Sequence, residues 1–256
     1  MSIKMEIGQV VWHDLLTHDV ARAKDFYAEL LGWQYQIEHA VNFVWKPGEA
    51  DYPLILANGE AHGGFVDSGQ DMPARWVAYV RVEAVDAVTA KAKMLGATVE
   101  WEPFDTPGVG RSAVLWDPQG AVICPHVPTH SFPPPAGTFL WDELMTADVE
   151  AATRFYRELF PWQINGVDRK QRGRYTLFKG ADDSDMAGAV KSMVSAAIWV
   201  PYLATNNLDL TIAKATAIGA TVSIEKSHSA HLGQFAVLAD PMGAVFGLVA
   251  ASEFPS

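Results

Sequence analysis

The chain has 256 residues, of which 49% are hydrophobic and 19% charged, and its formal net charge at pH 7 is −11. This composition is typical of a globular protein with enough apolar material for two domains. The negative charge and the absence of a basic run argue against nucleic acid or an anionic membrane surface as a partner. The single cysteine, Cys124, excludes an internal disulfide and a multi-cysteine zinc site.

No apolar stretch is long enough to span a bilayer, and the N-terminal residues lack the apolar region of a secretory signal. We therefore expect a cytoplasmic protein that interacts with no membrane.

The first elements alternate strand and helix. Residues 10–16 form a short apolar run that predicts a strand. Asp19 is suited to cap a helix that Gly32 ends. The apolar positions of this helix recur at the spacing of one buried face, namely Ala23, Phe26, Tyr27 and Leu30. Two strands, residues 35–44 and 52–57, follow around a turn at Pro47-Gly48, and a glycine-containing strand is expected at 62–65.

The next part repeats this order. Residues 76–82 predict a strand, and Asp86 is suited to cap a helix that runs to Leu95. Residues 98–101 predict a strand, followed by a loop that contains Pro103. The last two strands, 112–116 and 121–126, flank the sequence Asp-Pro-Gln-Gly, which is typical of a tight turn.

The chain contains an internal duplication. Val11–Gln34 returns as Leu140–Gln163 with 12 of 24 residues identical, and the later segments return as well, as Trp76–Val99 with Trp199–Val222 and Asp117–Val122 with Asp240–Val245. The duplication predicts two modules with separate cores, residues 1–127 and 138–256, joined by a proline-rich linker at 128–137. Because the two modules can pair within one chain, we expect a monomer rather than a homodimer.

The order of elements and a set of short motifs resemble the vicinal oxygen chelate superfamily, which includes glyoxalases, bleomycin-resistance proteins and extradiol dioxygenases. The residues that carry the resemblance are Thr17, Asp19, Phe26-Tyr27 and Gly32-Trp33, their counterparts Thr146, Asp148, Phe155-Tyr156 and Trp162, and both Asp-Pro-x-Gly-Ala turns. The chain looks most similar to tandem glyoxalase-like members. The resemblance implies an α+β fold of tandem βαβββ modules, with two curved mixed sheets, helices outside and ligands inside each cup.

The resemblance also indicates which residues face the cups. It assigns Trp12 and Asp14 to the first cup and Trp141 and Glu143 to the second. Metal-dependent relatives take ligands from three matched strand positions, which hold Trp12, Val77 and Cys124 in one copy and Trp141, Val200 and Gly247 in the other. Because indole and alkyl groups do not bind metal, we predict no metal site and no cofactor. A divalent ion bound by Asp14, Cys124 and His126, with His62, stays the alternative.

Two equivalent carboxylates are candidates for chemistry. Asp14 and Glu143 each lie two residues after a tryptophan, and an apolar cup would raise the pKa of such a carboxyl and suit it to acid–base work or to a ligand's hydrogen bond. The alternative is a structural pair with Arg81, a histidine or backbone donors. Candidate ligand contacts are Trp12, Tyr79, Cys124, His126, Trp141 and Tyr202.

Three functions are compatible with these features. We rank first a protein that binds a small aromatic or carbonyl compound in tryptophan-lined cups. An enzyme acting on a small carbonyl compound, with or without metal, comes second, and for it a lyase or isomerase is favoured over a dioxygenase. A non-catalytic structural or interaction protein, whose own side chains fill the cups, comes third.

Overall fold

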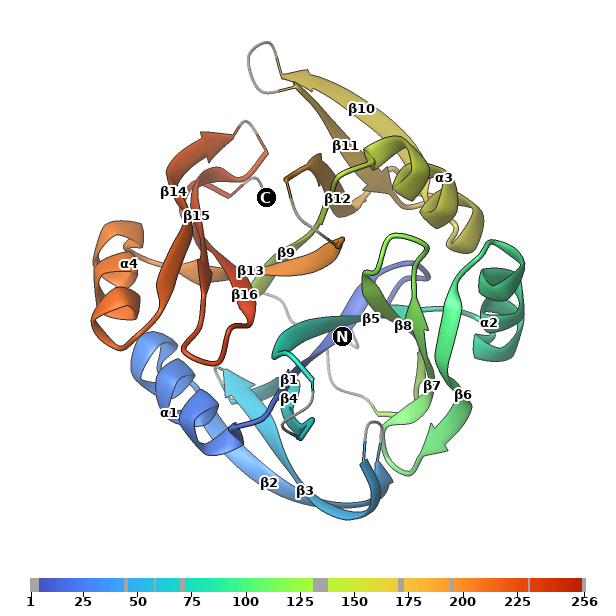
Figure 1. Cartoon of the computed structure of the whole chain (residues 1–256), viewed down its shortest axis with the longest axis horizontal. Helices are drawn as coiled ribbons and strands as arrows, with labels where there is room; N and C mark the ends of the chain where they lie inside the picture. Colours follow the sequence, from blue (N-terminus) through green and yellow to red (C-terminus); the bar gives the residue numbers. More distant parts are fainter. Residues whose placement is uncertain are drawn as a thin grey trace. The chain divides into compact units, whose positions relative to one another are not determined.

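The computed structural model describes residues 5–43, 46–57, 59–69, 72–130, 138–169, 173–193, 196–229 and 231–254 (Figure 1). Most of the predicted linker, residues 131–137, lies outside these ranges. No helix of the described part is long and apolar enough to cross a membrane.

The first repeat contains two βαβββ units in succession. Its elements are β1 (Val10–Thr17), α1 (Val20–Leu31), β2 (Gln34–Phe43), β3 (Lys46–Ala57), β4 (Glu60–Asp67), β5 (Arg75–Arg81), α2 (Val85–Met94), β6 (Thr98–Thr106), β7 (Gly110–Trp116) and β8 (Val122–Pro128).

The second repeat has the same order. Its elements are β9 (Phe139–Thr146), α3 (Val149–Leu159), β10 (Gln163–Arg169), β11 (Gly173–Lys179), β12 (Asp185–Lys191), β13 (Ile198–Thr205), α4 (Leu208–Ala217), β14 (Thr221–Ser229), β15 (Gly233–Ala239) and β16 (Val245–Ala250).

Each repeat forms one eight-stranded mixed sheet. The strand order is β2-β3-β4-β1-β5-β8-β7-β6 in the first sheet and β10-β11-β12-β9-β13-β16-β15-β14 in the second. The pairs β1–β4 and β5–β8 are parallel, whereas β2–β3 and β7–β8 are antiparallel. These sheets confirm the predicted α+β class with tandem βαβββ modules.

The start and end of α1 are set by the residues that the sequence indicated. The Asp19 carboxylate accepts a hydrogen bond from the backbone N–H of Arg22, at 3.0 Å. Gly32 follows the helix with a φ of 74°, and its N–H donates to the Ala28 carbonyl. Gly32 is suited to this left-handed position because it lacks a Cβ.

Two predictions about the second half of the first repeat are wrong in detail. Asp86 is not the N-cap of α2: Ala84 holds that position, and Asp86 in the first turn pairs with Arg111 instead. The segment around Pro103 is part of β6 rather than a loop. Because β6 is an edge strand with two irregularities of register, it accommodates a proline that a central strand would exclude.

The chain divides into two compact units that do not follow the repeats. Unit 1 comprises residues 1–12, 77–134 and 141–200, and unit 2 comprises residues 13–76, 135–140 and 201–256. Each unit therefore combines half of one repeat with half of the other. In Figure 1, α2 lies beside α3 in unit 1 and α1 lies beside α4 in unit 2.

Each unit has a core built from both repeats. The core of unit 1 joins Val80 and Ile123 to Leu144 and Phe155, and that of unit 2 has the same mixed origin. The expectation that each repeat holds its own core is thus corrected. The module boundaries themselves stay a prediction.

A buried tyrosine joins the two repeats within unit 1. Tyr156 Oη donates to Asp117 Oδ2 at 2.9 Å and accepts from Trp199 Nε1 at 2.9 Å. Asp117 Oδ1 accepts from the backbone N–H groups of Gln119 and Ala121. Burial raises the pKa of the Asp117 carboxyl, and these hydrogen bonds partly oppose that rise. The Asp-Pro-Gln-Gly turn of the first repeat is thereby fixed to α3 of the second.

Unit 2 contains the same arrangement with the repeats exchanged. Tyr27 Oη donates to Asp240 Oδ2 at 3.1 Å and accepts from Trp76 Nε1 at 3.1 Å. The other oxygen of Asp240 accepts from the N–H groups of Met242 and Ala244. Both copies of the Phe-Tyr and Asp-Pro-x-Gly motifs therefore serve to hold the repeats together.

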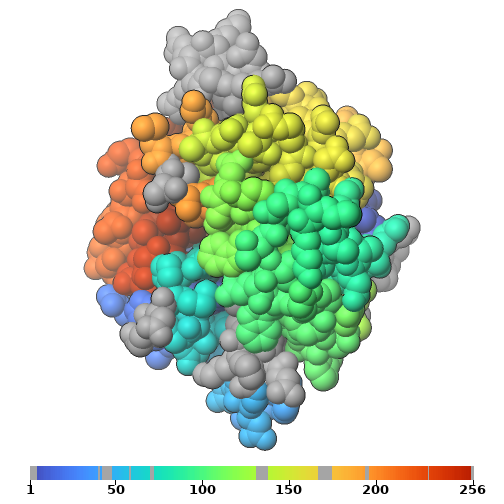
Figure 2. All heavy atoms as spheres, turned by 45° about the vertical axis from the view of Figure 1, so that its right-hand side comes forward, coloured from blue at the N-terminus to red at the C-terminus, as the bar shows by residue number. Residues whose placement is uncertain are grey.

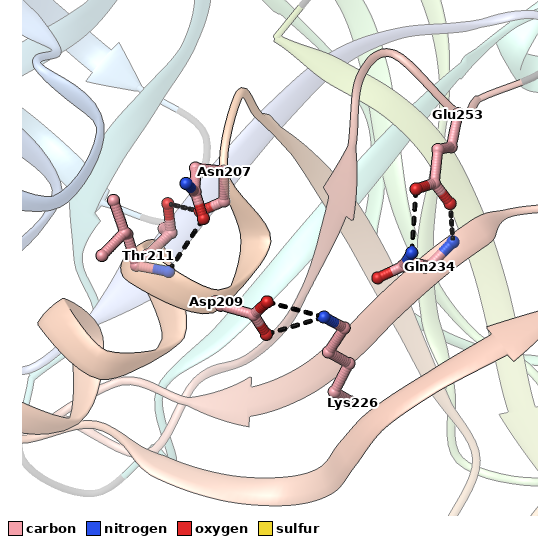
Figure 3. Close-up of polar contacts among 7 residues, drawn as sticks. Asn207, Asp209, Thr211, Lys226, Gln234 and Glu253 are labelled. Carbon is pink, nitrogen blue, oxygen red and sulfur yellow. Dashed lines mark hydrogen bonds and ion pairs between the residues drawn. The ribbon is translucent and has the colours of Figure 1, made fainter.

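The ends of α4 and of the chain are held by exposed polar contacts in unit 2 (Figure 3). The Asn207 side chain accepts from the N–H of Leu210 and caps α4. Lys226 on β14 pairs with Asp209 in the first turn of α4, and Gln234 on β15 bonds to the Glu253 carboxylate. Such exposed pairs contribute little to stability individually, about 0–1 kcal/mol each, but they fix α4 against its sheet.

Loss of the Tyr156 hydroxyl should destabilise the protein strongly. In a Tyr156→Phe variant, Asp117 Oδ2 and Trp199 Nε1 both lose a partner within the core, so we expect the free energy of unfolding to fall by about 2–4 kcal/mol in urea titrations. Tyr35→Phe is a matched control, since the Tyr35 hydroxyl is half-buried and donates to the Lys24 carbonyl, and we expect a loss of about 1 kcal/mol or less. Equal losses in the two variants would contradict the structural role of the tyrosine.

Candidate functional site

Alternation along the strands assigns one sheet face to the core and the other to the candidate site. Leu15 of β1 lies in the core of unit 2, and Ile123 of β8 lies in the core of unit 1. The intervening residues Trp12, Cys124 and His126 belong to neither core cluster, although all three are buried. They therefore point to the opposite face, as the resemblance implied.

Four aromatic rings meet on this face of unit 1. The ring centroids of Tyr79 and His126 lie 5.6 Å apart, those of His126 and His130 lie 6.1 Å apart, and those of His130 and Trp12 lie 5.3 Å apart. The parallel pairing of β5 with β8 places Cys124 opposite Tyr79. The structure thus brings together the predicted residues Trp12, Tyr79, Cys124 and His126. We call them, with Ser112 and His130, the His126 cluster.

Ser112 and His130 were missed by the sequence analysis. Ser112 lies opposite His126 in the antiparallel pair β7–β8, which a register assignment could have revealed. His130 falls in the predicted linker, just after β8, and no pattern in the sequence distinguishes it.

His126 forms a hydrogen bond with Ser112 across the β7–β8 pair. Ser112 Oγ lies 2.8 Å from His126 Nδ1, and a bond to the backbone of Arg111 raises the pKa of the ring. In the tautomer that has its proton on Nδ1, Ser112 Oγ accepts from the ring. Nε2 is then an acceptor, and it is buried with no hydrogen-bond partner among the described residues.

Burial keeps the His126 ring neutral. Loss of solvent, together with the neighbouring His130, lowers the pKa of His126 to about 3. Gly110 permits this arrangement, because a Cβ on Gly110 would lie 2.8 Å from Cε1 of the His126 ring. The His126 cluster therefore presents a neutral acceptor nitrogen among aromatic rings.

The second copy places different residues at the equivalent positions of unit 2. Phe235 and Val249 correspond to Ser112 and His126, and they pair in the same register between β15 and β16. Both are apolar and buried, and the Tyr202 ring lies edge-on to Phe235 at 6.0 Å. The serine–histidine pair is thus a property of the first copy.

Trp141 and Asp14 each form a hydrogen bond with a tyrosine, and the ring of that tyrosine covers a glycine. In unit 1, Trp141 Nε1 donates to Tyr175 Oη at 2.9 Å. The Tyr175 ring covers Gly188, which pairs with Glu143 in the parallel β9–β12 ladder. A Cβ on Gly188 would lie 2.2 Å from Tyr175 Oη, so this ring position requires glycine.

Unit 2 has the same arrangement of a tyrosine over a glycine, here beside Asp14. Tyr52 Oη donates to Asp14 Oδ1 at 2.6 Å, and both side chains are buried. The Tyr52 ring covers Gly64, which pairs with Asp14 in the β1–β4 ladder. Tyr52 and Tyr175 were missed by the sequence analysis, although each precedes its glycine by a similar distance in the two repeats.

The residues at the family's metal positions do not fit a divalent ion. Trp12 and Trp141 supply rings rather than ligands, and the ring of Tyr202 occupies the space over Gly247, where a Cβ would lie 2.2 Å from Cδ1. Among the described residues, no group of three or more His, Cys, Asp and Glu side chains is placed to hold a metal. His62, considered above as a fourth ligand, lies on β4 in unit 2, and burial lowers its pKa.

Comparisons with known proteins agree with this architecture. The family described as Glyoxalase-like domain matches residues 10–125 and 139–249. A protein of Mycobacterium tuberculosis named "Putative glyoxylase CFP32" is 30% identical over 253 residues, with 94% of each chain covered. A Streptomyces protein named "Anthracycline biosynthesis protein DauV" is 28% identical, covering 96% of this chain and 94% of its own.

A solved structure shows the same fold. The Mn(II)-bound glyoxalase from Novosphingobium aromaticivorans superposes with a TM-score of 0.64 at 15% identity, covering 95% of this chain and 82% of its own. The chain therefore has the vicinal oxygen chelate fold.

The neutral His126 ring makes stability depend on pH. Its folded pKa lies below the unfolded value of 6.5, so below pH 6.5 the unfolded chain binds a proton that the folded chain does not. The His126 contribution is thus present above pH 6.5 and lost as pH falls toward 3, by up to about 1.4 kcal/mol per pH unit. We expect His126→Gln to lose less stability than the wild type between pH 7 and pH 5 in urea titrations. His39→Gln, at an exposed site, is the control, and a His126→Gln slope as steep as that of wild type would contradict the assignment.

Proposed function

Because the chain belongs to the glyoxalase-like domain family, we propose that it binds a small aromatic or carbonyl compound beside the His126 cluster. The observation that carries this proposal is the buried His126 Nε2, an acceptor without a hydrogen-bond partner in the described structure. A buried acceptor of this kind costs about 1–3 kcal/mol until a partner is supplied. A ligand with an O–H or N–H group would supply it.

The rings around His126 indicate the shape of the ligand. Trp12 and Tyr79 offer flat apolar surfaces that suit a planar molecule, and aromatic pairs contribute about 0.5–1.5 kcal/mol beyond the area that they bury. The name of the Streptomyces relative, an anthracycline biosynthesis protein, supports an aromatic compound. A phenol or a hydroxylated aromatic carbonyl compound combines the flat surface with the required donor.

The electrostatics favour binding over proton transfer. A general base works best when its pKa lies near the operating pH, and a ring with a pKa of about 3 accepts a proton poorly at neutral pH. Such a ring still accepts a hydrogen bond. We therefore assign His126 to ligand recognition.

We propose further that Asp14 and Glu143 take part in binding in the manner expected from their matched positions. Tyr52 donates to one oxygen of Asp14, and the carboxyl group of Asp14 matches that of Glu143 in position. Trp141, which lies in unit 1 with Glu143, and Tyr202, which lies in unit 2, would each offer an aromatic surface to a ligand of their own unit. From the net charge of −11 we also propose that the protein functions without nucleic acid or membrane partners. Because the two repeats pair within one chain, we propose that it is a monomer.

An enzyme acting on a small carbonyl compound is the second candidate. The relative named as a glyoxylase and the fold of the manganese-bound glyoxalase favour it. A structural role, with both cups filled by side chains, is the third. Turnover of 2-oxoaldehydes, with and without added divalent metal, separates the second candidate from the first.

Metal content provides a direct check. Since the matched positions hold Trp12, Trp141 and Gly247, we expect protein purified without added metal to contain well under one equivalent of iron, nickel, zinc or manganese. Chelator should leave the melting temperature unchanged, because no metal stabilises the native state. A stoichiometric metal that is lost in a His126→Ala variant would favour the enzyme.

Ligand binding should depend on His126 in a specific way. In a screen of phenols and aromatic carbonyl compounds by tryptophan fluorescence, we expect ligands that quench the wild type and raise its melting temperature. His126→Phe keeps a ring but removes the acceptor, so affinity should fall by about 1–2 kcal/mol for ligands with a donor group and little for their methyl ethers. Asp14→Asn and Glu143→Gln test the carboxylates, with an expected loss of about 1.5–3 kcal/mol for a charge-assisted bond.

Trp12→Phe identifies the reporting indole and should remove most of the fluorescence change. If no compound binds, or if His126→Phe weakens hydroxylated and methylated ligands equally, the proposed recognition by His126 is wrong.

A further inference from the structure

Unit 1 contains an open cavity on the side of its sheet that carries the helices. The cavity has a volume of about 690 Å³, within the range of small-molecule sites, and it lies between the segment that precedes β1, the start of α2 and the end of α3. Its apolar wall includes Ile7, Val82, Val88 and Leu159. Val82 and Leu159 also belong to the helix-side core, so this cavity is separate from the His126 cluster on the opposite face.

Figure 2 is turned to bring forward the side of the molecule on which α2 and α3 lie. Green atoms of the α2 region and yellow-green atoms of the α3 region lie together there. At the start of α2, Ala84 and Ala87 line the cavity and are exposed to solvent. Both are small side chains at the start of the helix, which leaves the space open to solvent.

The polar residues of the cavity are mainly acidic. Glu6, Glu83 and Asp182 contribute carboxylates, whereas Arg81 contributes the one guanidinium among the lining residues of the described structure. Arg81 already donates through Nη1 to the carbonyl of Met5. The excess of carboxylates gives the cavity a net negative charge.

Two of these carboxylates lie close together. Asp182 accepts from the N–H and Oγ of Ser184, and Glu6 lines the cavity beside it. These contacts, with Ser184 first, lower the pKa of Asp182, so its carboxylate is charged at neutral pH. Because both carboxyl groups line the cavity, one cation bound there could contact both.

The start of α2 does not reverse this charge. Ala84 occupies the N-cap position and provides no side-chain hydrogen bond to the first turn of the helix. A helix N-terminus corresponds to about half a positive charge. Glu83 lines the cavity just before the helix and offsets this partial charge, whereas Asp86 in the first turn is paired with Arg111.

We propose that this cavity binds a small organic cation, an amine with an apolar or aromatic body. The ammonium group contacts Glu6 and Asp182, and the apolar body packs against Leu159 and Val88. Charge and lining are complementary to such a molecule: the carboxylates select the cation, and the alkyl side chains favour an apolar body over a hydrated metal ion.

Calorimetric titration of the full-length protein with phenethylammonium tests the proposal, with 3-phenylpropionate as the anion of similar size. We expect the cation to bind and the anion not to bind. Binding should weaken as salt is raised, because exposed charges are screened. Equal binding of the two probes, or no binding of the cation at low salt, would overturn the proposal.

Substitutions locate the site. Asp182→Asn and Glu6→Gln should each weaken cation binding about three- to tenfold, in keeping with one partly exposed charge pair. Glu150→Gln, at an exposed position on α3 outside the cavity lining, should leave it unchanged. Ala87→Phe should abolish binding by filling the open side, at a position exposed enough to accept the larger ring.

The outcome is independent of the function proposed for the His126 cluster. His126→Phe should leave phenethylammonium binding unchanged, and Ala87→Phe should leave phenol binding unchanged. If His126→Phe removes cation binding, the cation occupies the other face of the sheet and the cavity proposal fails, whereas the His126 proposal stands.

Discussion

The fold depends on a buried hydrogen bond between a tyrosine of one repeat and an aspartate of the other. Tyr156 donates to Asp117 in unit 1, and Tyr27 donates to Asp240 in unit 2. A buried carboxylate without partners would cost several kcal/mol. Here two backbone N–H groups and one phenol satisfy each carboxylate, so the Asp-Pro-x-Gly turn of one repeat is complete only when the helix of the other repeat is in place.

This interaction explains why the compact units cross the repeat boundary. The aromatic rings that surround Tyr156 come from the second repeat, whereas the β-strands that complete the same core come from the first. Neither repeat alone could bury its helices. The cores occupy the helix side of each sheet, so Trp12, Tyr79 and His126 lie on the opposite face. The strands that carry this candidate site are held in register by the cores.

The two copies have diverged on that opposite face more than in the cores. Tyrosines lie over glycines in both copies, as Tyr52 does over Gly64 and Tyr175 over Gly188. The first copy then adds the polar pair of Ser112 and His126, where the second has apolar side chains. Core packing constrains the helix side in both copies, and the tyrosine–glycine contacts constrain only part of the other face.

The sequence by itself determined the duplication, the element order, the ends of α1 and the face on which each strand residue lies. These features depend on local spacing, capping residues and the alternation of strands, which a sequence contains directly. It also predicted Trp12, Tyr79, Cys124 and His126 as ligand contacts, and the structure places these four residues together on one sheet face. The extent of β6 and the N-cap of α2 could not be read in this way, because pairing with β7 and the contact between Asp86 and Arg111 decide them.

Only the tertiary structure decided which residues meet. The partner of Asp117 lies 39 residues away and that of Asp240 lies 213 residues away, on helices of the opposite repeat. The contacts of His126 with Ser112 and His130, the unpartnered Nε2 and the acidic cavity beside α2 and α3 have the same origin. Such contacts arise from strand register and from the packing of distant segments, and burial, which sets the pKa of His126, exists only once that packing is complete.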